Sequence, residues 1–97
     1  MKFKVVEGCT SVDAYQLMYE KKAKIDLKKA AEAISKIGEI LGETKVVLFA
    51  KLVKDKVTAS VSIYEDGRVI IKNVSKDDAG VFGEIITNML EEKGAFI

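Results

Sequence analysis

The 97-residue chain contains no histidine, no tryptophan and no proline, and Cys9 is its only cysteine. Without histidine, a serine or cysteine nucleophile has no imidazole base, which argues against a catalytic triad or dyad. One cysteine cannot form an intrachain disulfide, and it cannot assemble a typical structural zinc site alone. We therefore predict no catalytic residues, no cofactor and no metal site, and we expect Cys9 to be buried or half-buried.

The chain also has almost no net charge, with 16 Lys and Arg against 15 Asp and Glu. Such a balance gives no global attraction to nucleic acid or membrane, so any basic site must be local. The longest apolar runs, such as residues 46–50, are far shorter than the roughly 20 residues of a membrane helix, and residues 1–4 do not open a signal peptide. We expect a soluble cytoplasmic protein with no membrane partner.

What is present suits a folded domain, because 48% of the residues are hydrophobic and 32% are charged. A chain of this length fits one domain, which we expect to span residues 1–97. Lys, Glu and Ile are abundant and amide side chains are few. This bias is typical of thermophilic proteins and indicates an archaeal or thermophilic source.

Periodicity predicts strands and helices in a definite order. Residues 2–7 alternate with a period of two, which predicts a strand. Residues 11–22 have apolar residues at helical spacing after Ser11, which favours a short helix but leaves irregular structure open. Asp26 is a good N-cap, and the apolar stripe after it predicts a helix that runs to Leu41 and ends at Gly42.

The second half of the chain predicts three strands and a closing helix. Residues 45–53 and 57–64 are separated by the polar turn 54–56 and form a hairpin. The Asp66-Gly67 pair then favours a tight turn into a strand over residues 69–74. Ser75 is the expected N-cap of the last helix, with Lys93 and Gly94 as its C-terminal signals. The fold class is therefore α+β, with an antiparallel sheet of about four strands in the order β-α-(α)-β-β-β-α.

The apolar sides of the predicted helices can all be buried against one face of the sheet, so the other face should be open. Strict alternation in residues 57–64 points Val57, Ala59, Val61 and Ile63 inward, and in residues 45–53 we expect Val46 inward with Val47 and Phe49 outward. Hydroxyls, lysines and aromatics then share the open face. The residues of the possible binding face are Lys4, Phe49, Thr58, Ser60, Ser62, Tyr64 and Lys72.

Residues 57–71, VTASVSIYEDGRVII, followed by 73–79, NVSKDDA, resemble one repeat of the TATA-box-binding protein family. In that family a strand ending in an aromatic residue and a Gly-basic turn lead to another strand and a helix with a Ser-x-x-Asp/Glu cap. Residues 24–29, KIDLKK, are similar to the segment that opens the family's first helix. The resemblance implies a half-saddle fold, with Tyr64 as a kinking wedge and the open face toward a DNA minor groove. The family carries two repeats, so one repeat would have to dimerise.

Three other groups of residues have a plain structural explanation beside a functional one. Gly80 and Gly83 inside the last helix indicate close contact with the sheet rather than a phosphate loop. The Lys-rich segments 21–24 and 28–29 are typical of a solvated helix surface. The acidic residues fit helix caps and turns better than a calcium or magnesium site, whose loop spacing they lack; they are Asp66, Asp77, Asp78, Glu91 and Glu92.

The sequence is compatible with three functions. The first is a small non-enzymatic binding protein that acts through the open face, as a homodimer with a protein partner. The second is a nucleic-acid-binding module on the same face, and the third is a binder of a divalent cation or an anionic metabolite.

Overall fold

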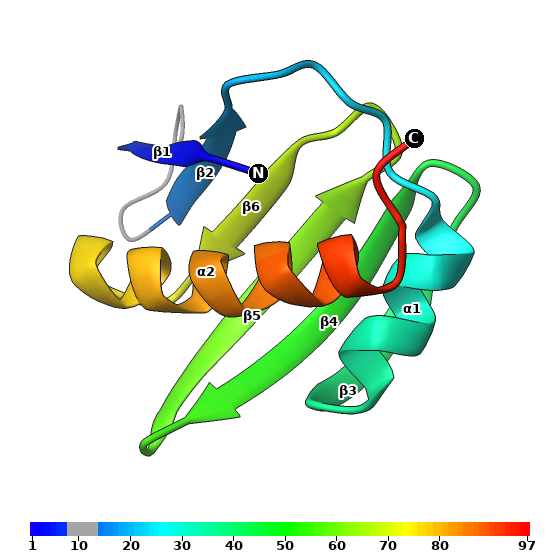
Figure 1. Cartoon of the computed structure of the whole chain (residues 1–97). Coiled ribbons are helices and arrows are strands. Elements are labelled where there is room, and N and C mark those ends of the chain that lie inside the picture. The colour runs from blue at the N-terminus through cyan, green and yellow to red at the C-terminus, as the bar shows by residue number, and fades with distance from the viewer. Residues whose placement is uncertain (8–13) are drawn as a thin grey trace.

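The computed structural model describes residues 1–7 and 14–97, which form one antiparallel sheet and two helices (Figure 1). The strands are β1 (Phe3–Glu7), β2 (Ala14–Tyr19), β3 (Gly38–Glu43), β4 (Val47–Lys54), β5 (Val57–Tyr64) and β6 (Val69–Lys72). The helices are α1 (Leu27–Ser35) and α2 (Lys76–Glu92). The sheet order is β1-β2-β6-β5-β4-β3. The α+β class is confirmed, but the prediction of about four strands and their order is wrong.

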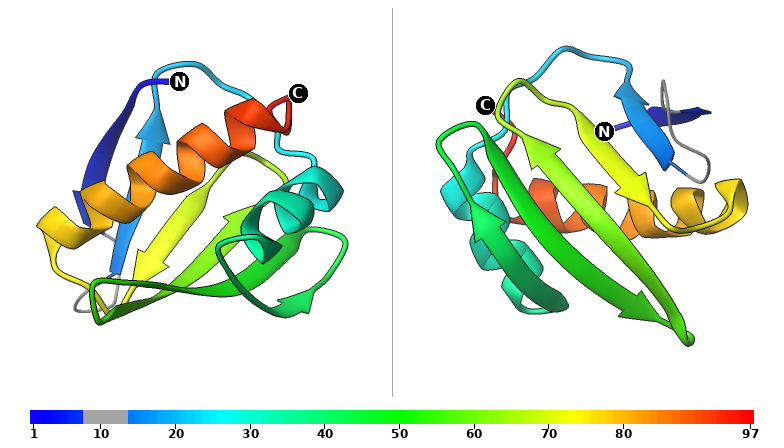
Figure 2. Two further views of the ribbon diagram at one scale, coloured as in Figure 1. Left: turned by 60° about the horizontal axis from the view of Figure 1, so that its bottom comes forward. Right: turned by 180° about the vertical axis from the view of Figure 1, so that it is seen from behind.

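Both helices lie against the same face of the sheet, which Figure 2 shows from two sides. The strands turn alternate residues toward the helices, and these residues are buried; examples are Leu48, Ile63 and Ile71. Among the described residues, buried apolar side chains from both helices and from β2, β4, β5 and β6 join in one hydrophobic cluster, and partly buried residues of β1 and β3 pack against it. Burial of this surface is the main source of stability, and it uses one sheet face only.

The helix predicted within residues 11–22 is wrong where the structure describes it, because residues 14–19 form strand β2. Residues 8–13, which include Cys9 and the expected N-cap Ser11, lie outside the described residues. Strand β2 pairs with β1 on one side and with β6 on the other. Strand β6 is far from β2 in the chain, and the backbone hydrogen bonds to both partners outweigh the local helical spacing.

The helix predicted from Asp26 to Leu41 begins as expected but ends early, at Ser35. The side chain of Asp26 accepts hydrogen bonds from the backbone N–H groups of Lys28 and Lys29. Residues 38–43 then form strand β3 along β4, with a bulge between Ile40 and Gly42. Gly38 lies so close to β4 that a Cβ atom there would collide with the Leu52 side chain and the Lys51 carbonyl.

The hairpins and the last helix are confirmed. The turn between β4 and β5 has positive φ angles at Asp55 and Lys56, and the turn before β6 has Gly67 at φ 102°. The hydroxyl of Ser75 accepts a hydrogen bond from the backbone N–H of Asp78, as expected of an N-cap. These local signals were sufficient because each of them acts within a few residues.

The two glycines of α2 have different surroundings. A Cβ atom on Gly83 would lie 2.8 Å from Leu17 Cδ2 and 3.0 Å from the Phe3 ring, so the predicted close contact is present there. A Cβ atom on Gly80 would have no such neighbour within 4 Å, so the contact explanation fails at Gly80. Gly83 is the residue that allows α2 to approach β1 and β2.

This difference predicts opposite effects of one substitution at two positions. Gly80→Ala should raise the free energy of unfolding by about 0.5–1 kcal/mol, because alanine reduces the entropy of the unfolded chain. Gly83→Ala should show no gain or a loss, because its methyl group crowds Leu17 and Phe3. Urea denaturation of both variants measures the difference, and an equal gain in both would contradict the close contact at Gly83.

Candidate binding face of the sheet

The sheet face opposite the helices carries the residues that we singled out, and we call it the outer face (Figure 2, right). Strand pairing arranges its side chains in rows that cross the sheet, because paired residues on neighbouring strands point to the same side. The central row runs from β1 to β4 through Val6, Gln16, Ile70, Ser62 and Phe49. This row contains no charged residue.

Basic residues lie on both sides of the central row. Lys72 of β6, Ser60 of β5 and Lys51 of β4 are paired in the next row. On the other side of the central row, Lys4 of β1 is paired with Met18 of β2. Along β1, β2 and β4–β6, these three lysines are the outward-facing charges. Glu39 of the edge strand β3 is paired with Lys51. The outer face is therefore locally basic in a chain whose net charge is +1.

Apolar side chains are exposed on this face. Phe49 is 41% exposed, and Met18 and Val53 are exposed still further. An exposed apolar residue on its own is ordinary, but several on one uncovered sheet face are typical of a contact surface. Val46, which we expected inward, is 60% exposed and lies just before β4, while Val47 is buried opposite Tyr64. Because β4 begins at Val47, the alternation of the strand does not set the direction of the Val46 side chain.

Tyr64 lies at the end of β5 with one side of its ring covered. The Arg68 guanidinium stands 4.4 Å from the ring centroid of Tyr64. Asp66 holds that guanidinium, since Nε of Arg68 donates to Oδ2 of Asp66 over 2.9 Å. A planar ligand that stacked on this face of Tyr64 would have to displace Arg68 or extend the stack beyond it.

The serines of β5 are less accessible than a solvated face would require. Ser62 is 9% exposed between its paired neighbours Phe49 and Ile70. Ser60 is half-buried, and its hydroxyl accepts a hydrogen bond from the Asn73 side chain. Thr58, at the far end of the strand, is exposed. The two serine hydroxyls therefore lie between larger side chains, and the lysines, Phe49 and Thr58 are more accessible.

All seven residues of the predicted binding face lie on the outer face, on four strands. Lys4 is on β1, Phe49 on β4 and Lys72 on β6, and the other four are on β5. The sequence reasoning missed Val6, Gln16 and Met18. The last two belong to β2, which we had assigned to a helix. The alternation of Tyr15, Leu17 and Tyr19 with these two residues was the signal that could have found them.

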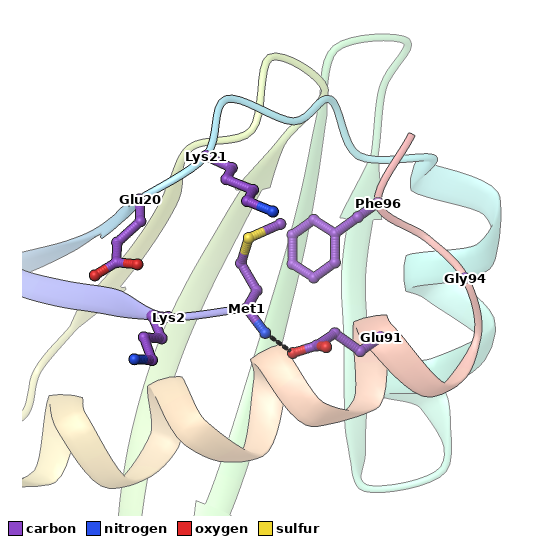
Figure 3. A pocket seen from close by; sticks show the side chains of 7 residues that line it. All are labelled: Met1, Lys2, Glu20, Lys21, Glu91, Gly94 and Phe96. Atoms are coloured by element: carbon purple, nitrogen blue, oxygen red, sulfur yellow. Dashed lines mark hydrogen bonds and ion pairs between the residues drawn. The ribbon is translucent and has the colours of Figure 1, made fainter.

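A concavity of about 560 Å³ lies elsewhere, at the C-terminal end of α2 (Figure 3). Its lining includes two lysines, two glutamates and the ring of Phe96. The amino group of Met1 pairs with Glu91 there. Charges of both signs are mixed in the lining, and one glutamate is already paired with the Met1 amino group, so no group of like charges stands ready for a ligand; we place the candidate site on the outer face.

Near this concavity, a buried hydrogen bond joins the sheet to α2. The Tyr19 hydroxyl lies 2.9 Å from the Thr87 hydroxyl, and Thr87 is 2% exposed. Burial raises the pKa of Tyr19 from 10.0 to about 12, although the hydrogen bond to Thr87 lowers it. The folded state thus keeps the Tyr19 proton at a pH where the unfolded chain loses it.

This shift predicts a loss of stability in alkali. The Tyr19 contribution is complete below pH 10 and is lost as pH rises toward 12, by at most about 1.4 kcal/mol per pH unit. Tyr19→Phe removes the titrating group and leaves the rest of the chain unchanged. Urea denaturation between pH 9 and pH 12 should show a steeper decline for the original chain than for Tyr19→Phe, and parallel curves would contradict the raised pKa.

No group of three or more acidic or cysteine side chains that could hold a metal ion occurs in residues 1–7 and 14–97. In the same residues, neither helix has the length and apolar character needed to cross a membrane. No protein-family model, curated protein or solved structure matches this chain.

Proposed function

We propose that this chain is a non-enzymatic binding protein whose contact surface is the outer face. The observation that carries the proposal is the combination of an uncharged central row, exposed Phe49 and flanking lysines on the uncovered side of the sheet. An uncharged row with an exposed aromatic ring, between cations, suits a partner with an apolar or planar middle and negative charges on both sides. The substrate of an enzyme would need a pocket, whereas a sheet face suits an extended partner.

Nucleic acid is the partner class that we propose to test first. Bases present planar surfaces for Phe49 and for the Tyr64–Arg68 stack, and phosphates would meet Lys4, Lys51 and Lys72. The resemblance to a TATA-box-binding repeat gives additional support, because the order of β5, turn, β6 and capped α2 is the order on which it was based. That order recurs in many folds, so the charges carry the proposal.

Binding to mixed-sequence oligonucleotides should weaken steeply as salt concentration rises. For a duplex, the slope of log K against log salt is about −0.9 per phosphate contacted, so three lysines predict a slope near −3. The double variant Lys51→Ala/Lys72→Ala should reduce the size of this slope by about 2. Fluorescence anisotropy titrations over a series of salt concentrations, with single-stranded and duplex oligonucleotides, measure it.

The matched control is Lys28→Ala/Lys29→Ala, which removes two exposed lysines from α1 on the helix side. This variant should leave the slope unchanged. Equal loss in both double variants would mean that charge alone governs binding, without a defined site. Absent or salt-independent binding would end the nucleic-acid proposal.

The wider proposal needs a separate test of location. Amide chemical shifts can be followed while oligonucleotides, or acidic amphipathic peptides, are added to the folded chain. We expect the largest changes along the central row, and we expect Phe49→Glu to abolish them because it places a negative charge among the lysines. Changes confined to α1 and α2 would overturn the assignment to the outer face.

A further inference from the structure

The sheet has two edge strands, β3 and β1, and they differ in their capacity to pair with another strand. The pairing of β3 shifts at a bulge between Ile40 and Gly42, and exposed Glu39 and Glu43 lie near its ends. Bulges and charges on an edge oppose pairing with other chains. Strand β1 has an unbroken register of five residues with β2, and its other side has no partner among the described strands.

The hydrogen-bond pattern shows which groups β1 presents on its free side. The backbone N–H of Glu20 donates to the Lys2 carbonyl over 3.0 Å, and these two residues are in register. Backbone groups alternate in direction along an antiparallel strand, so those of Lys4 and Val6 also point to β2. The N–H and C=O groups of Phe3, Val5 and Glu7 therefore point outward.

We propose that a second copy of this chain pairs with β1, antiparallel, about a two-fold axis that passes through Val5. In this register Val5 pairs with Val5 of the second copy, and Phe3 pairs with its Glu7. All three outward-facing residues of each copy then exchange hydrogen bonds, so no free edge group is left over. The strand is therefore complementary to itself at one register.

The side chains favour the same register. On the outer face, Lys4 comes to lie opposite Val6 of the second copy, so no like charges face each other. A two-fold axis at Lys4 would instead place the two Lys4 side chains directly opposite, and it would use only Phe3 and Val5 for hydrogen bonds. The axis at Val5 therefore gives more hydrogen bonds and less repulsion than the axis at Lys4.

The pairing makes one sheet of twelve strands from two copies, counting the six described strands of each. A two-fold axis perpendicular to the sheet keeps both outer faces on the same side, so the central row of each copy continues at Val6 into the Lys4–Met18 row of the other. This inference goes beyond the proposed function and does not depend on which ligand is bound. It specifies the homodimer that we expected from the sequence.

The test uses the exposed residue Val6, whose side chain would lie opposite Lys4 of the second copy. Val6→Lys places like charges opposite each other twice in the dimer, whereas Val6→Glu places opposite charges there. We expect the dimer dissociation constant, measured by sedimentation over a range of concentrations, to rise about tenfold for Val6→Lys and to fall by a similar factor for Val6→Glu at low salt. Thermal unfolding monitors the fold of each variant.

The decisive variant is Lys4→Glu/Val6→Lys, which restores opposite charges across the interface. It should recover the dimer that Val6→Lys loses, a result that a merely damaged fold would not give. Val46→Lys, at an exposed position just before β4 and therefore separated from β1 by three strands, should leave the dissociation constant unchanged. A monomer at every concentration, or a dimer insensitive to the charge at position 6, would overturn the inference and leave outer-face binding by the monomer intact. A dimer that responds to these charges but binds no ligand would support the pairing of β1 and contradict the proposed function.

Discussion

Replacing Gly67 with alanine is expected to lower the free energy of unfolding by about 3 kcal/mol or more. Gly67 has φ 102°, a conformation that residues with a side chain rarely adopt. In addition, a Cβ atom at this position would collide with the backbone carbonyl oxygen of Ala23. A backbone atom cannot move aside as a side chain can, so the turn or the segment beside it must shift. Urea denaturation measures the loss.

The matched control is Gly94→Ala, because Gly94 also has a positive φ, of 66°, but no neighbour that a Cβ atom would meet within 4 Å. This variant should cost about 1–2 kcal/mol, the price of the backbone conformation alone. The difference between the two variants reports the collision with Ala23 together with the larger φ angle of Gly67. Equal losses would contradict the close approach of the turn to residue 23.

Phe82→Ala is expected to cost about 3–5 kcal/mol of stability. Phe82 is 2% exposed and belongs to the side of α2 that packs on the sheet. Truncation removes the ring from the core and leaves a cavity that the surrounding side chains fill only partly. Thermal or urea denaturation would show the effect as a lowered midpoint.

Phe49→Ala makes the same chemical change on the other side of the sheet and serves as the comparison. Phe49 is 41% exposed, so its truncation should cost about 1 kcal/mol. If the proposed function is correct, this variant loses ligand binding while it keeps its fold. A greater loss of stability for Phe49→Ala than for Phe82→Ala would mean that we have assigned the two sheet faces the wrong way round.

The candidate face could be predicted where the alternation was strict. Along β5, Thr58, Ser60 and Tyr64 alternate with apolar residues, and that period of two places them opposite the core whatever the neighbouring strands are. On β2 the same pattern was shorter, and helical spacing competed with it. Gln16 and Met18 were missed for this reason, and with them the contribution of β2 to the outer face.

The length of the first long helix shows the same limit. Ile34, Ile37 and Leu41 fit a helical stripe, yet the chain leaves the helix after Ser35 and forms β3. Pairing with β4 decides this, because Gly38 can lie against Leu52 where no larger residue fits. Periodicity reports only the spacing of residues within one segment, so it does not indicate pairing with a strand that lies ten or more residues away.

By itself, the sequence determined the α+β class, the caps and turns, and which residues of β4–β6 point away from the helices. Each of these depends on residues close together in the chain. Only the tertiary structure decided that β2 and β3 are strands, that β1 is at the edge of the described sheet, and that Lys51, Ser60 and Lys72 share one row. Strand order and register arise from contacts between distant segments, so local sequence patterns do not give the arrangement of side chains on the outer face.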